Sequence, residues 1–256
     1  MEIVVVDDGS TDRTAEAVRS RPEVNYLWQR RRGSGAARNR GLAAARGELV
    51  ASLDSDDVWE PDFLERSVAI LEQHGLDFAF SNYRREPAEP TYLDYEVAAG
   101  RLDRFRAEAR TDWALLDPQQ ARDMFLRGCP APSSAMLLRR ASMPPRWNEN
   151  LQIADDWYLL LEMTVRARAR GAFTLQPLWT KRVDGSNKFD GRSPAYMARA
   201  LWLHDLRWFH RDFGELLSAR ERWHWTHRGV RQRLWLACLQ LRGLDERLQP
   251  LHSAAS

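Results

Sequence analysis

The chain has 256 residues, of which 44% are hydrophobic and 29% charged, a composition typical of one large α/β domain with or without a tail. Its formal net charge of +2 excludes a strongly basic field, so no nucleic-acid partner is expected. No apolar run approaches the roughly 20 residues that span a bilayer. Cys129 and Cys238 are too few for a disulfide framework or a zinc site, which indicates a reducing, cytoplasmic setting.

The first 81 residues alternate strand-like runs with helix-like segments. Strands are predicted where β-branched and other apolar residues cluster, and helices end where a glycine follows, as at Gly47 and Gly75. The predicted strands are residues 2–7, 25–28, 48–53 and 78–81, and the predicted helices are residues 14–19, 36–45 and 61–71. This alternation predicts an α/β fold with a Rossmann-like, mostly parallel central sheet flanked by helices.

The middle of the chain has a different character, because charged residues and prolines dominate residues 84–128. We predict a loop followed by a helix there, in contact with a partner or substrate. Further on, apolar runs predict strands at 134–138 and 173–178, and the spacing of apolar residues predicts a helix at 155–169.

The segment from Pro194 onward is predicted to be helical, and it holds many of the chain's 11 tryptophans beside arginines. An amphipathic Trp/Arg helix can lie on a membrane surface, which would make the protein peripheral on the inner face of the membrane. The alternative, which we favour, is a helical tail that packs on the sheet domain while its arginine stems reach along the surface to water.

Three acidic clusters end or follow predicted strands or open a predicted helix. They are Asp7-Asp8, residues 54–57 and Asp155-Asp156. Because the carboxyl ends of strands in an open α/β sheet share one edge, these clusters can converge. Carboxylates so close together repel, and Mg²⁺ or Mn²⁺ would neutralise them, with substrate phosphates completing the shell. The alternative for each cluster alone is an ordinary turn or helix cap.

Five short segments occur in a fixed order along residues 2–190. They are residues 4–12, 35–41, 54–57, 135–140 and 151–157. In this order they resemble the motifs of family 2 glycosyltransferases: the second strand and its turn, a Gly-x-x-x-Ala-Arg-Asn-x-Gly helix, an Asp-x-Asp metal motif, the strand before the acceptor site, and a Glu-Asp-Trp segment. The resemblance implies a GT-A fold over 1–190, with 84–128 as a variable acceptor-side insertion and 191–256 as a helical extension.

The resemblance also implies a reaction. The chain would be a metal-dependent inverting transferase that moves a sugar from a nucleotide-diphosphate donor, expected to be a UDP-sugar, to a hydroxyl. The acceptor would be a saccharide, lipid-linked or protein molecule, in a process such as cell-surface polysaccharide synthesis. A catalytically inactive nucleotide-sugar-binding relative is the alternative, and a phosphoryl-transfer enzyme is a third reading that no Gly-x-x-x-x-Gly-Lys-[Ser/Thr] loop supports.

The resemblance assigns six residues to the donor: Asp7, Asp8, Arg38, Asp54, Arg182 and Ser186. Asp8 would accept a hydrogen bond from the nucleotide base, and Asp54 would approach the ribose. Arg38 would lie near the diphosphate, where its charge suits the ligand, or would be an ordinary surface arginine of a helix. The last two would belong to a loop over the diphosphate.

The resemblance assigns four carboxylates to the metal and the chemistry. Asp56 and Asp57 would bind Mn²⁺ or Mg²⁺, and Asp156 would take the proton from the acceptor hydroxyl, with Asp155 as the alternate base. Two further segments have open interpretations. Residues 132–134 either line the acceptor pocket or form a plain turn, and Trp157 either stacks on a sugar or packs on its helix face.

Family members begin with a further strand and helix, and that strand is central in the sheet. A chain that starts at the strand of residues 2–7 would leave backbone donors and acceptors unpaired at the sheet's centre. We therefore expect that the natural protein is longer, or that this form is unstable and inactive.

Overall fold

The computed structural model describes residues 1–103, 105, 112–183 and 192–241. Its strands are β1 (Ile3–Asp7), β2 (Val24–Trp28), β3 (Leu49–Ala51), β4 (Asp57–Trp59), β5 (Phe78–Glu86), β6 (Trp113–Leu116), β7 (Met136–Arg139) and β8 (Gly171–Arg182). Its α-helices are α1 (Thr14–Arg19), α2 (Ser34–Ala44), α3 (Phe63–His74), α4 (Tyr92–Ala98), α6 (Pro118–Arg127), α7 (Asp155–Leu161), α8 (Pro194–Met197), α9 (Leu206–Phe213) and α10 (Ala219–Leu241). Short 3₁₀ turns are η1 (Ser133–Ala135), η2 (Arg140–Ser142) and η5 (Gly214–Leu216), and π-helical turns are η3 (Glu162–Arg166) and η4 (Ala198–Asp205).

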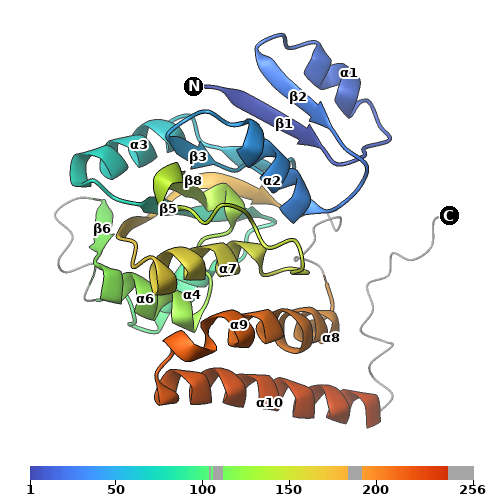
Figure 1. The fold of residues 1–256 in the computed structure, drawn as a ribbon. Coiled ribbons are helices and arrows are strands. Elements are labelled where there is room, and N and C mark those ends of the chain that lie inside the picture. The colour runs from blue at the N-terminus through green and yellow to red at the C-terminus, as the bar shows by residue number, and fades with distance from the viewer. Residues whose placement is uncertain (104, 106–111, 184–191, 242–256) are drawn as a thin grey trace.

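A six-stranded sheet forms the centre of the molecule, in the order β3-β7-β5-β8-β4, with β6 also paired to β8. Helices flank it and the C-terminal region is helical, so the predicted α/β class with a central sheet is confirmed (Figure 1). The pairing directions differ from the expected mostly parallel arrangement. Among the described strands of this sheet, only β5 and β8 pair in parallel, because β7 runs antiparallel between β3 and β5, and β4 and β6 are antiparallel to β8.

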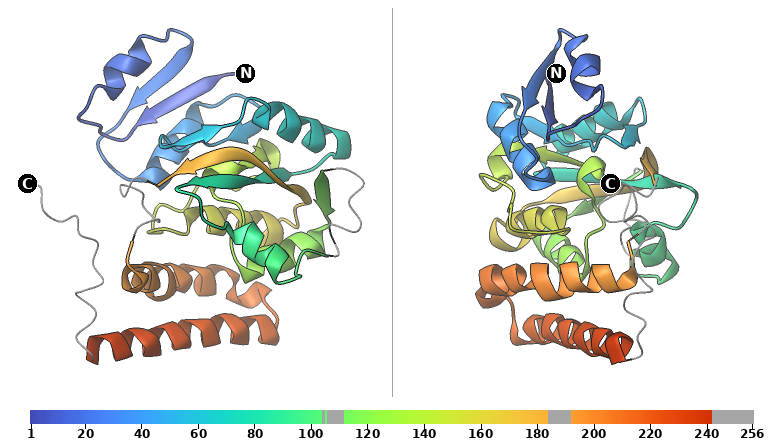
Figure 2. Two further views of the ribbon diagram at one scale, coloured as in Figure 1. Left: turned by 180° about the vertical axis from the view of Figure 1, so that it is seen from behind. Right: turned by 90° about the vertical axis from the view of Figure 1, so that its right-hand side faces the viewer.

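The first two strands form a separate parallel pair, with Ile3 opposite Val24 and Asp7 opposite Trp28. This pair, with α1, lies apart from the central sheet, on the side where α2 and α3 also lie (Figures 1 and 2). Within the described residues β1 pairs only with β2. Gly9 then turns the chain with a φ of +79°, and a Cβ there would come within 2.9 Å of the Arg31 backbone nitrogen. A glycine is therefore required where β1 ends at Asp7 and Asp8.

Aromatic side chains build the core between the sheet and the helices on its other side, α4, α6 and α7. Phe80 of β5 stacks on Phe173 of β8 at 5.7 Å between ring centroids, and Phe125 of α6 meets Phe78 and Phe80 edge to face. Trp157 is buried in this layer, donates from its indole nitrogen to the Phe125 carbonyl at 2.6 Å, and packs edge to face on Phe209. Helix packing, rather than sugar stacking, is thus the observed role of Trp157.

The predicted elements correspond closely to the observed ones up to β5, where hydrophobic periodicity and glycine stops are clear. Gly75 ends α3 in the left-handed conformation with a φ of +56°, as the sequence predicts. Two short strands, β4 and β6, were not predicted, because three- and four-residue strands carry too little periodicity. Among its described residues, segment 84–128 therefore contains β6 and the helices α4 and α6, where a loop and one helix were predicted.

No helix in the described ranges is long and apolar enough to cross a membrane.

Gly171 sits where β8 begins against β5, and its lack of a side chain is a packing requirement. A Cβ at this position would lie 2.3 Å from ring carbons of Phe78, which is fully buried. We expect Gly171→Ala to lower the free energy of unfolding by about 1–3 kcal/mol through overpacking. Urea denaturation measures this. Gly214→Ala is the control, because nothing lies within 4 Å of its Cβ position and its φ is negative, so an equal loss in both variants would contradict the packing argument.

Candidate functional site

Arg38 of α2 is the centre of the acidic site. Its guanidinium donates to Asp155 Oδ2 at 2.6 Å and to Asp54 Oδ1 at 2.7 Å, and it lies 3.6 Å from Asp156 Oδ1. The side chain is only 12% exposed and packs over the Trp147 ring, 5.0 Å from its centroid. Burial lowers the pKa of Arg38, but the carboxylates of Asp156, Asp54 and Asp155 outweigh it and raise the pKa overall. A permanent cation therefore holds together carboxylates from two of the three predicted clusters.

Ser134 connects Asp57 to Asp54, which is itself bound to Arg38. Ser134 accepts a hydrogen bond from the Asp54 backbone at 3.1 Å and donates to Asp57 Oδ2 at 2.6 Å. The other oxygen of Asp57 is buried and finds no hydrogen-bond donor among the described residues. Burial raises the pKa of Asp57 to about 6, against the hydrogen bond from Ser134 and with a further contribution from Asp56 and Asp54. Asp57 is thus a carboxyl with a buried oxygen still to be satisfied.

Asp156 and Asp155 share the first turn of α7 but have different surroundings. Asp155 is bound to Arg38 and its side chain is 5% exposed, whereas that of Asp156 is 20% exposed. The hydroxyl of Ser133 donates to Asp156 Oδ1, and the backbone N–H of the same serine donates to Oδ2 at 3.0 Å. Burial raises the pKa of Asp156, as do Asp155 and Asp54, while Arg38 and Ser133 oppose the rise. Asp156 is therefore the better placed of the two to accept a proton.

The chain that leads into this helix turn is held by a carboxylate from the C-terminal helices. Asp205, at the end of η4, is fully buried. It accepts backbone hydrogen bonds from Gln152, Ile153 and Ala154 at 2.9, 2.9 and 3.0 Å. The C-terminal helical region thus fixes the segment from which Asp155 and Asp156 project.

We expect Asp205→Asn to weaken this anchor, because an amide offers one acceptor oxygen where the carboxylate offers two. The expected loss is about 1–3 kcal/mol in the free energy of unfolding, the usual cost of leaving buried N–H groups unsatisfied. Urea denaturation gives the stability, and hydrogen exchange at residues 152–154 gives the local effect. Asp123→Asn, on the surface of α6, is the control; unchanged exchange at 152–154 in Asp205→Asn would contradict the anchoring role.

Asp7 and Asp8, the first cluster, lie beside the loop that leads into α2 and do not contact Arg38. Asp8 accepts hydrogen bonds from Gln29 Nε2, Arg32 N and Gly33 N at 2.7, 2.8 and 2.7 Å. Burial raises the pKa of Asp8, but these donors outweigh it and lower the pKa overall. Asp7 is buried and accepts from the Tyr26 hydroxyl at 2.6 Å and the Ser10 backbone at 2.7 Å. The hydrogen bond from Tyr26 is the main reason that the pKa of Asp7 is lowered. Both carboxylates shape the loops around the start of α2.

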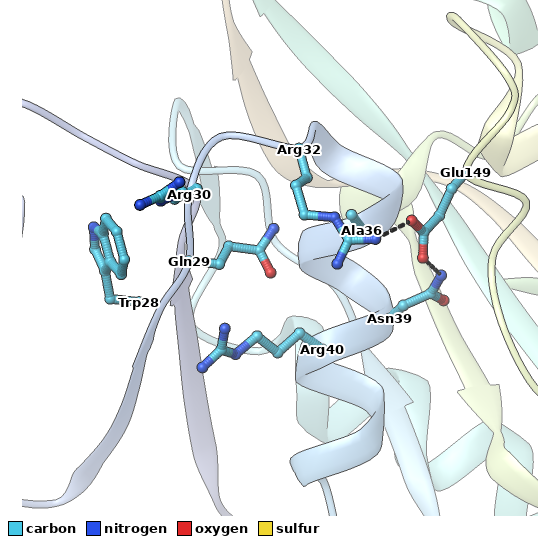
Figure 3. A pocket seen from close by; sticks show the side chains of 8 residues that line it. All are labelled: Trp28, Gln29, Arg30, Arg32, Ala36, Asn39, Arg40 and Glu149. Atoms are coloured by element: carbon cyan, nitrogen blue, oxygen red, sulfur yellow. Dashed lines mark hydrogen bonds and ion pairs between the residues drawn. The ribbon is translucent and has the colours of Figure 1, made fainter.

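A cavity of about 490 Å³ opens beside this loop, between the end of β2 and the face of α2 that carries Ala36 and Arg40 (Figure 3). Trp28, Arg30 and Arg32 line it, together with Glu149, which bonds Arg32 at 3.0 Å. Arg38 and the acidic cluster do not line it. The cavity therefore adjoins the Asp8 loop and not the carboxylates of the acidic site.

The structure brings Arg38, Asp54, Asp155 and Asp156 into direct contact, with Asp57 joined to them through Ser134. Arg182 lies at the end of β8, one residue past the partner of Asp57 in the strand register, and approaches Glu86 at 3.9 Å. Ser186 falls outside the described residues. Asp56 adjoins Asp57, where β4 begins.

Several residues of the site were not assigned by the sequence. Ser133 and Ser134 were noted only as a turn or an acceptor-pocket wall, although both bind site carboxylates. Asn39 clamps the Trp147 backbone in both directions, at 3.1 and 2.6 Å, and so presents the ring to Arg38. Asn39 lies within the Ala-Arg-Asn motif, which was the available signal; nothing in the sequence pointed to Trp147.

The described residues contain no cluster of three or more His, Cys, Asp or Glu side chains positioned to hold a metal. Asp56 and Asp57 nevertheless fit a divalent cation in one respect. Asp57 presents a buried carboxylate oxygen without a donor, and Asp54 and Asp56 are close enough to raise its pKa. Mg²⁺-type sites with one or two protein carboxylates are usually completed by substrate phosphates and water.

Comparisons with known proteins agree with this architecture. The fold resembles that of S. aureus TarS in complex with UDP-GlcNAc, with a TM-score of 0.58, 20% sequence identity, and coverage of 79% of this chain and 56% of that one. This likeness defines the fold as that of a GT-A-type α/β protein. Residues 1–128, half of the chain, match the family described as Glycosyl transferase family 2. The chain belongs to this family.

Curated relatives match parts of the chain. The succinoglycan biosynthesis protein ExoU of Rhizobium meliloti (strain 1021) is 32% identical over 184 residues, which are 67% of this chain and 49% of ExoU. The succinoglycan biosynthesis protein ExoO of the same organism is 42% identical over 85 residues, or 32% of this chain and 24% of ExoO. The chain thus spans half or less of the length of these relatives.

Proposed function

We propose that the chain transfers a sugar from a nucleotide-diphosphate donor, a UDP-sugar, to an acceptor hydroxyl with inversion at the anomeric carbon. The observation that carries the proposal is the joining of two separate acidic segments by Arg38, with Ser134 linking Asp54 to Asp57 and with Asp156 left as a partly exposed carboxylate of raised pKa. Perturbed carboxylates that converge from distant segments are typical of catalytic sites. Family membership gives this arrangement its reaction class.

Asp156 is the proposed base. One of its oxygens would take the proton of the acceptor hydroxyl while the hydroxyl oxygen forms a bond to the anomeric carbon. The bond from the anomeric carbon to the diphosphate oxygen breaks in the same step, and the diphosphate leaves with the electron pair. Ser133 holds the carboxylate through its backbone and hydroxyl, which fixes the direction in which the proton is received. Asp155, already bound to Arg38, serves as an anchor.

Donor recognition is proposed to involve the residues around the start of α2. Asp8 would contact the nucleotide base and Asp7 would support the turn beside it, while Asp54 would contact the ribose. Arg38 would orient Asp54 and the α7 carboxylates, with its charge directed also at the donor diphosphate. Arg182 and Ser186 would contribute from the segment after β8. The proposal is supported by the contact of Arg38 with Asp54 and by the hydrogen bonds that Asp8 accepts from Gln29, Arg32 and Gly33 before α2.

Asp56 and Asp57 would hold a divalent cation, Mn²⁺ or Mg²⁺. When bound there, such an ion supplies Lewis-acid stabilisation of the negative charge on the leaving diphosphate. Asp57 would contribute its buried free oxygen, and Ser134 would hold the other oxygen in place.

The acceptor is proposed to be a saccharide in polysaccharide synthesis, free or lipid-linked. Two relatives carry succinoglycan biosynthesis in their names, which supports this class of acceptor. Helices α4 and α6 lie on the same side of the sheet as α7, the helix to which Asp156 belongs, and would contribute to acceptor selection (Figure 1).

A thermal-shift measurement tests donor and metal binding together. With UDP and Mn²⁺ at about 100 times the Kd, we expect the melting temperature to rise by about 5–10 °C, from the usual linkage of binding to stability. Asp57→Asn is expected to lose most of that rise, because the amide keeps the Ser134 contact but gives up a charged ligand. Asp123→Asn is the matched control. A rise of equal size in Asp57→Asn, with the same dependence on Mn²⁺, would contradict the assigned metal site.

A further inference from the structure

The last described helix, α10, carries an apolar stripe along its outer side. Trp223, His227, Val230 and Leu234 follow one another at intervals of four, three and four residues, which places them on one face of a helix. Trp223 is 64% exposed, Leu234 63% and Val230 45%. The Trp223 and His227 rings stack at 5.0 Å, so the stripe is continuous in its first turn.

The opposite side of α10 fixes the helix to the protein. Trp225 and Leu236 are buried, and the Trp225 indole donates to the Leu126 carbonyl at 2.9 Å. Arg228 donates to the Arg127 carbonyl at 2.8 Å and covers the Trp202 ring. Figures 1 and 2 show α10 as the outermost layer, at the end of the molecule opposite to β1 and β2. The stripe therefore faces outward, while the contacts on the opposite side of α10 hold the helix in place.

Within α10, basic residues border the stripe and no carboxylate does. Helix α10 contains five arginines and two histidines against one carboxylate, Glu221. Glu221 is turned inward, where it pairs with Arg122 at 3.1 Å and accepts from the Ser218 backbone at 2.7 Å. Arg220, Arg231 and Arg233 are exposed. An outer face with tryptophan and leucine between arginines is complementary to an anionic, partly apolar surface.

A second copy of this chain fits the face poorly. Pairing of the same face on two copies would place the arginines of one helix near those of the other, with no carboxylate of α10 to separate them. A bilayer with anionic headgroups is both negatively charged and partly apolar. Its headgroups attract arginine, and the boundary with the acyl chains accepts tryptophan and leucine.

We propose that the outer face of α10 docks the protein on an anionic membrane surface, with Trp223, Val230 and Leu234 entering the headgroup boundary and Arg220, Arg231 and Arg233 contacting lipid phosphates. This inference concerns a surface remote from the acidic site and does not depend on the proposed sugar transfer.

Vesicle flotation of the full chain tests the docking. The protein is expected to float with phosphatidylcholine vesicles that contain 50% phosphatidylglycerol, to stay behind with pure phosphatidylcholine, and to be released in part by 0.5 M NaCl. Trp223→Ser/Leu234→Ser and Arg220→Glu/Arg231→Glu are each expected to lower the partition coefficient roughly tenfold or more. Tyr95→Ser, which changes an equally exposed aromatic residue on α4, should bind as the parent does.

Circular dichroism melts of each variant check the fold, and the exposed substitutions are expected to leave it intact. Absence of flotation of the parent with anionic vesicles would overturn the proposal, as would equal flotation of the parent and the Trp223→Ser/Leu234→Ser variant. A concentration-dependent dimer in light scattering, lost in that variant and accompanied by no vesicle binding, would assign the face to a second copy instead.

Discussion

Asp156→Asn is expected to lower kcat for sugar transfer by about 10²–10⁴-fold, the range that a positioned general base contributes. The amide keeps one oxygen, which can accept one of the two Ser133 hydrogen bonds, but it cannot take a proton at neutral pH. Donor binding should change little, because the change removes proton acceptance and leaves the segments around α2 intact. Steady-state release of UDP from the donor, with UDP binding measured by calorimetry, separates the two quantities.

Two comparisons sharpen this prediction. Asp155→Asn should retain much more turnover while losing more stability, because Asp155 is the buried ion-pair partner of Arg38. In the parent, a base works only when deprotonated, and the pKa of Asp156 is raised. The kcat should therefore fall on acidification, and the fall should begin at a pH above the usual pKa of an aspartate. A larger kcat loss in Asp155→Asn than in Asp156→Asn would contradict this assignment and make Asp155 the base.

Arg38→Met is expected to cost about 3–5 kcal/mol in the free energy of unfolding, the usual cost of leaving one partner of a buried ion pair uncompensated. Methionine fills a similar volume over Trp147 but leaves Asp54, Asp155 and Asp156 without their common cation. Repulsion from Asp54 and Asp155, no longer opposed by Arg38, would then raise the pKa of Asp156 further in the folded variant. Urea denaturation at neutral pH measures the loss.

The pH dependence of that loss identifies its origin. Carboxyls whose pKa is raised in the folded state take up protons on folding, so the variant should regain stability as the pH falls from 7 towards 5. Arg40→Met, an exposed arginine on the same helix, is the control and should cost less than about 0.5 kcal/mol. A loss in Arg38→Met that is the same at both pH values would indicate a packing effect instead of an electrostatic one.

The sequence predicted that three acidic clusters could converge at one sheet edge, and the structure brings two of them together. Asp7 and Asp8 instead lie at the end of β1, which belongs to the separate β1–β2 pair. Asp54 follows β3, and Asp155 and Asp156 open α7, and these three meet at Arg38. The sequence left two interpretations of Arg38 open: a contact to the donor diphosphate, or an ordinary surface arginine. The local pattern could not decide, because the partners of Arg38 are 16 and 117 residues away in sequence.

Other features depend on tertiary contacts that no local pattern encodes. From the sequence alone, Ser133 and Ser134 could be a plain turn. In the fold they precede β7 and bind Asp156 and Asp57, respectively. Asp205 lies in a helix of ordinary composition, and only the fold places it under residues 152–154. The sheet directions were mispredicted for a similar reason: alternating strands and helices suggest parallel pairing, but β7 enters the sheet after α6 and runs the other way.

UDP release from a panel of UDP-sugars with Mn²⁺ and saccharide acceptors, measured for the parent and for Asp156→Asn, tests the proposed sugar transfer most directly. We expect Mn²⁺-dependent release by the parent, a loss of about 10²-fold or more in the variant, and the same UDP affinity in both. Equal rates in the two proteins would contradict the role of Asp156. UDP binding without release by the parent across the whole panel would contradict sugar transfer and favour a nucleotide-sugar-binding protein.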